Sequence, residues 1–232
     1  MLDITPVTLH YFPIQGRGEP IRYLLADAGI SFSESNDVAQ FQAHKWDWAQ
    51  YRFNQLPRLT VTRDGPGPAG DGGRVEEHLA QQGAILRFLA RAAGYGAGAG
   101  LWHEALVDQV QDACEDLNGT YTRCIYAPDA PVLLRELVKT TVPKVMKQFE
   151  YIFAHNKSEA GYLAFDQPSY AEFHLLYLLH ALQKLQPSLL SAYPALAAWE
   201  ERMRARPGLK RYQPVHKMLN GNANGQGEVP LE

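Results

Sequence analysis

The sequence predicts a protein of two parts, an α/β domain over residues 1–93 followed by an all-α domain over residues 101–220. Three observations support this division. Short apolar segments alternate with helical periodicity before residue 94, a Gly/Ala-rich linker fills residues 94–100, and helical periodicity alone continues after it. The length of 232 residues also suits one or two domains that share a sizeable core.

The chain opens with a predicted strand, turn and helix. Residues 7–12 form a short apolar segment, Gly16 and Gly18 flank an arginine in a turn, and residues 20–28 have helical spacing. This order directs the N-terminus of the helix toward the end of the strand.

A second strand, a hairpin and a helix complete the first domain. Residues 30–35 can form a strand. Residues 58–62 and 74–79 are predicted to pair as a hairpin, because the segment 64–73 between them is rich in Gly and Pro. Residues 81–92 have the spacing of an amphipathic helix.

The second domain is predicted to be entirely helical. Ser169 and Glu172 have the spacing of a capping box, in which a hydroxyl and a carboxylate each satisfy a backbone N–H at a helix start. The residues 221–232 form a polar tail with little to bury. The expected helices cover residues 101–126, 131–155, 169–186 and 195–205.

The composition favours a soluble, cytoplasmic protein. No apolar run is long enough to cross a bilayer, and no leader segment is evident. The formal net charge is −3 with interspersed signs, so no basic stripe exists that could neutralise phosphates. We therefore expect small molecules as partners, and neither nucleic acid nor a membrane.

The cysteines and histidines predict neither a disulfide nor a metal site. Cys114 and Cys124 are ten residues apart in one predicted helix. That spacing is roughly 15 Å along the axis, too far for a disulfide, so reduced thiols are expected, with a redox thiol as the alternative. His174 and His180 are six residues apart and would point to different faces of a helix.

Tyr11 is the candidate catalytic residue. It stands at the C-terminal end of the first predicted strand, directly before the Gly-containing turn. An aromatic residue in a strand is commonly a packing residue. Open α/β layers, however, bind ligands at strand ends, and helix N–H groups favour anions there, so a hydroxyl at this position can hold a thiolate.

Several segments together resemble one enzyme family. Residues 11–25 read YFPIQGRGEPIRYLL, which is similar to the opening of tyrosine-type cytosolic glutathione transferases, closest to the pi and sigma classes. The resemblance covers nearly the whole chain, with the motifs in the family's order. The other matching segments are residues 55–57 before the third strand, residues 81–86 at a helix start, residues 106–126 and residues 205–210.

The resemblance implies a thioredoxin-like N-terminal domain that binds glutathione as co-substrate, and an all-helical C-terminal domain that supplies a hydrophobic pocket. Tyr11 would donate a hydrogen bond to the glutathione sulfur, whose thiolate then attacks hydrophobic electrophiles without a metal. Leu56 would pair its backbone with the cysteinyl unit as a short strand does, and Pro57 would be cis. The resemblance also places Arg17, Gln55 and Gln81 at glutathione, and Phe12, Ile14 and Tyr126 at the hydrophobic substrate.

Two departures from the family pattern affect the same site. Relatives have Gln-Ser at the start of the third helix, whereas this chain has Gln81 and Gln82, so a longer amide replaces the hydroxyl that contacts the γ-glutamyl carboxylate. Relatives also place a Trp and then a Lys at the glycyl carboxylate, whereas the order here is Lys45, Trp46 and Trp48. We predict Lys45 and Trp48 as the replacements, with simple packing as the alternative for both tryptophans.

The resemblance further implies a homodimer. Asp116 corresponds to an acidic residue that in relatives reaches across the dimer to the glutathione amino group. The alternative for Asp116 is one charge in the acidic run of a solvent-facing helix.

Conjugation of glutathione for detoxification is the leading function. The same thiolate could instead serve a glutathione-dependent peroxidase or isomerase. A non-catalytic carrier of hydrophobic ligands is the third possibility, which Gln82 favours. Retention of Tyr11, Arg17, Gln55 and the pair at residues 56–57 favours an enzyme, because a silent descendant has no chemical reason to keep them all.

Overall fold

The computed structural model describes residues 6–66, 72–95, 100–163 and 166–219, and its contacts divide the chain into two compact units. The first unit comprises Met1–Tyr95 with Arg211–Lys217, and the second comprises Gly96–Lys210 with Met218–Glu232. The predicted tail and most of the predicted linker lie outside the described residues. Arg211–Lys217 therefore groups with the first unit, which differs from its predicted place in the helical domain.

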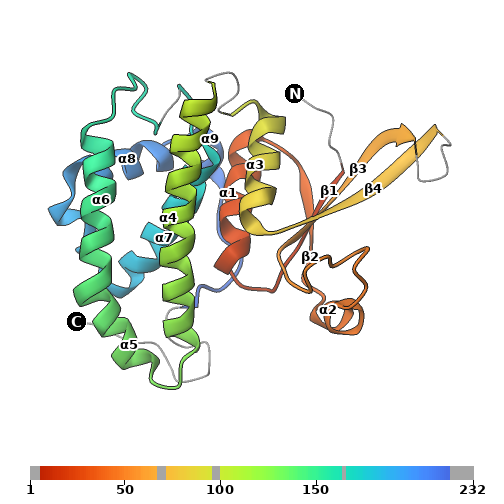
Figure 1. Cartoon of the computed structure of the whole chain (residues 1–232), viewed down its shortest axis with the longest axis horizontal. Coiled ribbons are helices and arrows are strands. Elements are labelled where there is room, and N and C mark those ends of the chain that lie inside the picture. The colour runs from red at the N-terminus through yellow and green to blue at the C-terminus, as the bar shows by residue number, and fades with distance from the viewer. Residues whose placement is uncertain (1–5, 67–71, 96–99, 164–165, 220–232) are drawn as a thin grey trace. The chain divides into compact units, whose positions relative to one another are not determined.

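A four-stranded sheet forms the centre of the first unit, with the strand order β2-β1-β3-β4 (Figure 1). β1 (Val7–His10) pairs in parallel with β2 (Phe32–Ser35) and antiparallel with β3 (Arg58–Pro66), which pairs antiparallel with β4 (Gly72–Ala80). β1 ends two residues earlier than predicted. Its last partner on β3 is Arg58, and the proline before Arg58 has no N–H to extend the ladder.

The hairpin of β3 and β4 is longer than the sequence predicts. The two strands pair in register from Arg58 opposite Ala80 to Pro66 opposite Gly72, so part of the predicted loop 64–73 belongs to the strands. Gly and Pro are common in turns. A β-ladder is nevertheless formed by backbone groups, and both residues are tolerated where two strands of a hairpin pair only with each other. The hairpin extends beyond the start of β1 in this way (Figure 1).

Helices α1 (Glu19–Ala28) and α3 (Gln82–Ala93) pack against each other beside the sheet (Figure 1). α1 contributes Ile21, Leu24 and Leu25 to the core and is capped at its C-terminus by Gly29, whose φ of 66° is left-handed. The short helix α2 (Val38–His44) begins at Asp37, whose carboxylate accepts the Gln40 N–H at 2.8 Å. Both predicted helices of this domain are thus present, together with the short helix α2.

The second unit is helical, as predicted, and α4 has the predicted bounds. The prediction of a single α-helix over residues 131–155 is wrong, because a π-helical segment interrupts the helix. Pro143 lacks the N–H that a regular turn would use there, and a wider turn accommodates its ring. The elements are α4 (Leu101–Tyr126), α5 (Ala130–Glu136), η2 (Leu137–Thr141), α6 (Val142–Ala154), α7 (Tyr170–Leu185), η3 (Leu189–Ala192), α8 (Pro194–Arg204) and α9 (Pro207–Arg211), with a short η1 (Gly16–Gly18) in the first unit.

α7 is the buried centre of the second unit. The predicted capping box forms at its start, where the Glu172 carboxylate accepts the Ser169 N–H at 2.6 Å and the Trp199 indole N–H at 2.8 Å. His174 lies between Gln111 and Asn118 of α4, 3.3 Å from each side-chain amide. Within the described ranges, no helix is both long enough and apolar enough for a membrane span.

A polar ladder crosses the sheet next to the end of β1. His10 Nε2 lies 3.0 Å from Thr60 Oγ1, which lies 3.0 Å from His78 Nδ1, and Arg58 Nη2 approaches His10 Nδ1 to 3.0 Å. Burial, followed by the positive charge of Arg58 and the neighbouring His78, lowers the pKa of His10 to about 4. His10 is therefore neutral in the folded protein at pH values where an unfolded histidine is already charged.

This difference predicts an acid-dependent loss of stability. The folded protein resists protonation of His10 while the unfolded chain accepts the proton near pH 6.5, so the free energy of unfolding should fall as pH drops from 6.5 toward 4. We expect His10→Asn to reduce the slope of the urea midpoint against pH over this window. His44→Asn, at an exposed position of α2, is the matched control. An unchanged slope in His10→Asn would contradict the prediction.

Candidate active site

The sheet register gathers the predicted glutathione segments at one edge. His10 of β1 pairs with Arg58 of β3, which in turn pairs with Ala80 of β4. Tyr11, Pro57 and Gln81 are the next residues beyond these three pairing partners, so they lie at the same end of neighbouring strands. The Leu56–Pro57 peptide bond is cis, as the resemblance implies.

The Tyr11 side chain is held against the turn that follows β1. Tyr11 as a whole residue is 6% exposed, and its hydroxyl oxygen accepts the Arg17 backbone N–H at 2.8 Å. The two glycines of the turn make room for it. A Cβ at Gly16 would lie 2.7 Å from the Tyr11 hydroxyl, and one at Gly18 would lie 2.6 Å from the ring. Gly16 also has a φ of 42°, which favours glycine.

The turn supplies a backbone hydrogen-bond donor to the hydroxyl. The Arg17 N–H belongs to η1, which leads directly into α1, so the N-terminal ends of both helices are close to the phenol in sequence. Helix N-termini stabilise anions, and a phenol that accepts an N–H can also donate its own proton. The arrangement can therefore stabilise an anionic sulfur next to Tyr11.

Two exposed amides lie beside the cis-proline segment. Gln81 Nε2 donates to Gln55 Oε1 at 3.4 Å, and both side chains are exposed. Gln81 is the N-cap of α3 and has a φ of 73°. Since α3 has twelve residues, its first N–H groups can favour a carboxylate, which is what a peptide terminus presents.

Gln82 is turned into the protein. It is only 3% exposed, and neither Oε1 nor Nε2 of its amide has a hydrogen-bond partner among the residues that the structure describes. The sequence places Gln82 at glutathione, but nothing in the sequence indicated that its amide is buried. An unsatisfied buried amide costs free energy, about 1–3 kcal/mol per group in proteins.

The segment after α2 presents the residues predicted to replace the family's Trp and Lys. Lys45 is half-buried, with Nζ 5.8 Å from the centre of the Trp46 ring. Trp46 and Trp48 are exposed by 68% and 67%. Simple packing in the core, the alternative considered for Trp46 and Trp48, therefore does not account for either side chain. Their side chains are available to a ligand, and the contacts of the described residues do not tie them to Tyr11.

The residues predicted for the hydrophobic substrate divide between the two units. Phe12 packs edge-on against Tyr11 and Phe41, with ring centres 5.6 and 5.8 Å apart. Ile14 forms a β-bridge with Lys217. Tyr126 ends α4 in the second unit and is 48% exposed, and partial burial raises the pKa of its hydroxyl.

The second unit carries both cysteines and Asp116. Both cysteines are free, and burial raises the pKa of the Cys114 and Cys124 thiols, which disfavours thiolates. Asp116 is exposed on α4. No cluster of three or more metal-ligating side chains occurs in the described ranges.

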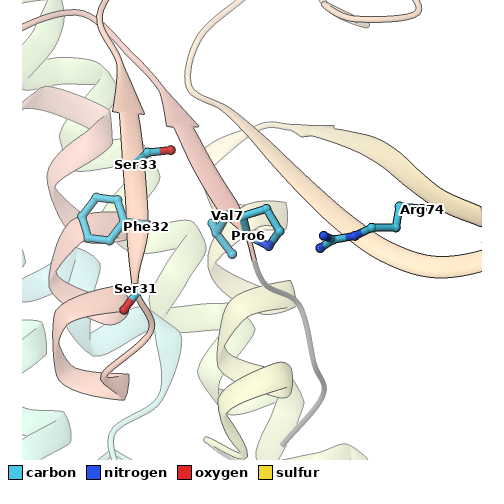
Figure 2. A pocket seen from close by; sticks show the side chains of 6 residues that line it. All are labelled: Pro6, Val7, Ser31, Phe32, Ser33 and Arg74. Carbon is cyan, nitrogen blue, oxygen red and sulfur yellow. The ribbon is translucent and has the colours of Figure 1, made fainter.

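A hollow elsewhere on the first unit is separate from these residues. Figure 2 shows it near the start of β1, whereas Tyr11 follows the end of that strand. The hollow is open and has a volume of about 480 Å³. Its lining consists of Pro6, Val7, Ser31, Phe32, Ser33 and Arg74.

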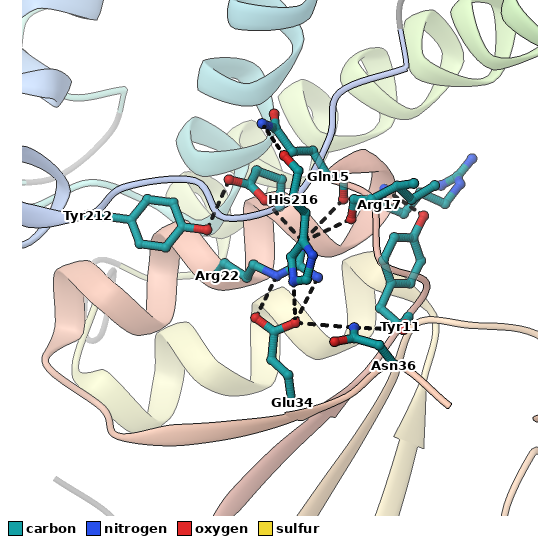
Figure 3. Close-up of polar contacts among 10 residues, drawn as sticks. Tyr11, Gln15, Arg17, Arg22, Glu34, Asn36, Tyr212 and His216 are labelled. Carbon is teal, nitrogen blue, oxygen red and sulfur yellow. Dashed lines mark hydrogen bonds and ion pairs between the residues drawn. The ribbon is translucent and has the colours of Figure 1, made fainter. Parts of the chain in front are cut away.

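Sequence reasoning missed a polar group beneath the Tyr11 loop. Arg22 is fully buried and forms hydrogen bonds with Glu19 and Glu34, and Asn36 donates to the Tyr11 carbonyl at 3.1 Å (Figure 3). The guanidinium carbon of Arg22 lies 5.9 Å from the centre of the Tyr11 ring. The available signal was an arginine among the apolar residues on the buried face of α1.

Comparison with known proteins identifies the family. Residues 115–214 match the family model described as "Glutathione S-transferase, C-terminal domain". The chain is 35% identical to glutathione S-transferase P of Bos taurus, covering 96% of this chain and 99% of that one, and 33% identical to the Homo sapiens protein of the same name with the same coverage. The solved pi-class glutathione S-transferase of Onchocerca volvulus matches with a TM-score of 0.74 and 30% identity, over 89% of this chain and 91% of that one. The chain therefore belongs to the glutathione S-transferase family.

Proposed function

We propose that this enzyme binds glutathione at the end of β1 and transfers its sulfur to hydrophobic electrophiles. The observation that carries the proposal is the Tyr11 hydroxyl, which accepts the Arg17 N–H, on a residue that lies at the same end of the sheet as the cis Leu56–Pro57 bond. Relatives named glutathione S-transferase P support the same chemistry. Reaction with hydrophobic electrophiles serves detoxification, and a cytoplasmic location is part of the proposal, which cell fractionation tests.

Tyr11 acts by stabilising the thiolate of bound glutathione. A free thiol with a pKa of about 8.5 is mostly protonated at neutral pH, and lowering that pKa by roughly two units requires about 2.7 kcal/mol. One hydrogen bond to a charged group contributes about 1.5–3 kcal/mol, and a helix N-terminus adds to it. The attacking atom belongs to the bound tripeptide, so no protein nucleophile is required, and the hydrogen bond with the helix N-terminus can stabilise the thiolate without a metal.

The neighbouring segments hold the rest of the peptide. Leu56 pairs its backbone with the cysteinyl unit, because this residue, two positions before the start of β3, has both an N–H and a C=O group to offer. Gln55, Gln81 and the start of α3 take the γ-glutamyl end, and Arg17 adds positive charge. Lys45 and the exposed Trp48 take the glycyl carboxylate.

We assign Phe12, Ile14 and Tyr126 to the binding of the hydrophobic electrophile. Tyr126 carries a partly exposed hydroxyl, which can donate to a carbonyl or epoxide oxygen as negative charge develops on it. The test of the whole function is the initial rate of conjugation to an aryl chloride as glutathione is varied. Saturable turnover supports the transferase. Retention on immobilised glutathione without turnover of aryl chloride, peroxide or isomerisation substrates would favour a carrier instead.

We propose a homodimer in which Asp116 of each subunit contributes to the glutathione site of the partner subunit. Its exposed carboxylate on α4 is suited to pairing with the glutathione amino group. We expect sedimentation to show a dimer, and Asp116→Asn to raise the half-saturation for glutathione about threefold, the effect of one solvent-accessible ion pair. Asp112→Asn, an exposed acid one turn earlier, is the control. A monomer at assay concentration would contradict the dimer, and an unchanged half-saturation would contradict the role of Asp116.

Tyr11→Phe tests the thiolate donor. The variant should fold and be retained on immobilised glutathione, while the pKa of the bound thiol rises and conjugation slows by about tenfold or more, because one donor to the anion is lost. Thiolate absorbance against pH measures the first effect and steady-state kinetics the second. Tyr151→Phe, at an exposed position of α6, is the control. Unchanged thiolate absorbance in Tyr11→Phe would remove the role assigned here.

Gln82→Ser tests the departure at the start of α3. A hydroxyl in place of the buried amide should gain a hydrogen bond to the γ-glutamyl carboxylate and lower the half-saturation for glutathione by about tenfold, the value of one such bond. Gln82→Ala removes the amide without supplying a donor, so it should not reproduce the gain. Equal half-saturation in the serine and alanine variants would show that the hydroxyl is not what this chain lacks.

A further inference from the structure

The segment Arg211–Lys217, named here the C-terminal strap, lies against the loop that carries Tyr11 (Figure 3). Lys217 forms a parallel β-bridge with Ile14, and its carbonyl accepts the Gln15 N–H at 2.9 Å. The Gln15 side chain donates to the His216 carbonyl at 3.0 Å. The strap therefore acts as a short extra strand on the loop between Tyr11 and Arg17, although about 200 residues separate them in sequence.

Arg22 also forms hydrogen bonds with this loop. Its Nη1 donates to the carbonyls of Ile14 and Gln15 at 3.2 and 3.4 Å. Its Nε and Nη2 donate to the two carboxylate oxygens of Glu34 at 2.9 and 3.0 Å, a bidentate pair. Glu34 in turn lies 3.4 Å from the amide of Asn36, which donates to the Tyr11 carbonyl. Arg22 and Glu34 thus fix both ends of the segment that precedes Arg17.

Two side chains of the strap complete this buried group. His216 Nε2 lies 2.8 Å from Glu34 Oε2, and the Tyr212 hydroxyl donates to Glu19 Oε1 at 3.0 Å. The Tyr212 ring also packs edge-on against Tyr23, with ring centres 5.5 Å apart. The His216 and Glu34 side chains are 13% and 18% exposed, so water contributes little to this contact.

The charges explain why the strap is needed there. Glu19 and Glu34 are two carboxylates around the single guanidinium of Arg22. Burial raises the pKa of Glu19 despite its bonds to Arg22 and Tyr212. Burial would also raise the pKa of Glu34, but the hydrogen bonds and charges of Arg22 and His216 together lower it. A donor on the strap therefore supports the second carboxylate, which one arginine cannot satisfy alone.

We propose that His216 is a positioning residue for the reaction, holding the Tyr11–Arg17 loop in place through Glu34 and through the Gln15 contacts of the strap. The proposal rests on the proposed function, in which Tyr11 stabilises the glutathione thiolate. His216 affects the geometry of the site, because the Tyr11 hydroxyl and the Arg17 N–H must keep their distances to the glutathione sulfur. Small displacements of a catalytic group reduce the rate of the chemical step more than they reduce binding.

The test compares His216→Ala with wild type in the full chain. Loss of the contact to Glu34 should raise the pKa of the bound thiol by about half a unit to one unit and lower kcat by about threefold to tenfold, while KM for glutathione stays within about twofold. His216→Gln retains an N–H donor that can reach Glu34, and should restore both the thiol pKa and kcat toward wild type. Thiolate absorbance against pH and steady-state kinetics are the two measurements.

Lys217→Ala is the matched control in the same strap. Lys217 bonds to the loop through its backbone carbonyl, so the alanine variant keeps that contact and should behave as wild type. Far-UV circular dichroism and retention on immobilised glutathione establish that each variant is folded.

Three outcomes would overturn the proposal. A wild-type thiol pKa and kcat in folded His216→Ala would show that the contact does not position the loop. Failure of His216→Gln to restore either quantity would show that the N–H donor is not what matters. An equal loss in His216→Ala and Lys217→Ala would indicate general destabilisation of the strap. If wild type itself binds glutathione without turnover, the proposed function fails first, and the thiol pKa still tests the strap separately.

Discussion

The arrangement around Tyr11 depends on compensating one buried cation. Arg22 is fully excluded from solvent, and a buried guanidinium is tolerated only where acceptors take up its donors. Those acceptors come from different segments: Glu19 from the start of α1, Glu34 from β2, and the Gln15 carbonyl from the loop after β1. Satisfying this charge therefore orders the loop on which the Tyr11 hydroxyl and the Arg17 N–H meet.

The sheet imposes the second constraint on the site. Because His10, Arg58 and Ala80 are paired across neighbouring strands, the backbone pairing brings the residues beyond them to one edge of the sheet. The cis-proline segment and the start of α3 are placed in this way. The polar ladder through His10 lies beside the same edge, so the backbone pairing there is reinforced by side chains.

In the second unit, the buried polar side chains of α7 find hydrogen-bond partners on the elements packed around it. Glu172 takes up N–H donors from the helix start and from Trp199, and His174 lies between two amides of α4. Such groups are costly to bury without partners, so each of them favours one packing of the helices over others. Gln82 in the first unit is different, because its buried amide lacks such partners among the described residues.

The sequence by itself determined the elements whose signals are local. Helical periodicity predicted α4 with its observed bounds, the spacing of Ser169 and Glu172 predicted the capping box, and the strand-turn-helix order put Tyr11 at a strand end. Only the tertiary structure decided that Gln82 is buried and that the C-terminal strap packs against the Tyr11 loop. The physical reason is that burial and ion pairing depend on residues far apart in the chain, and no local pattern records which distant segment will satisfy a buried charge.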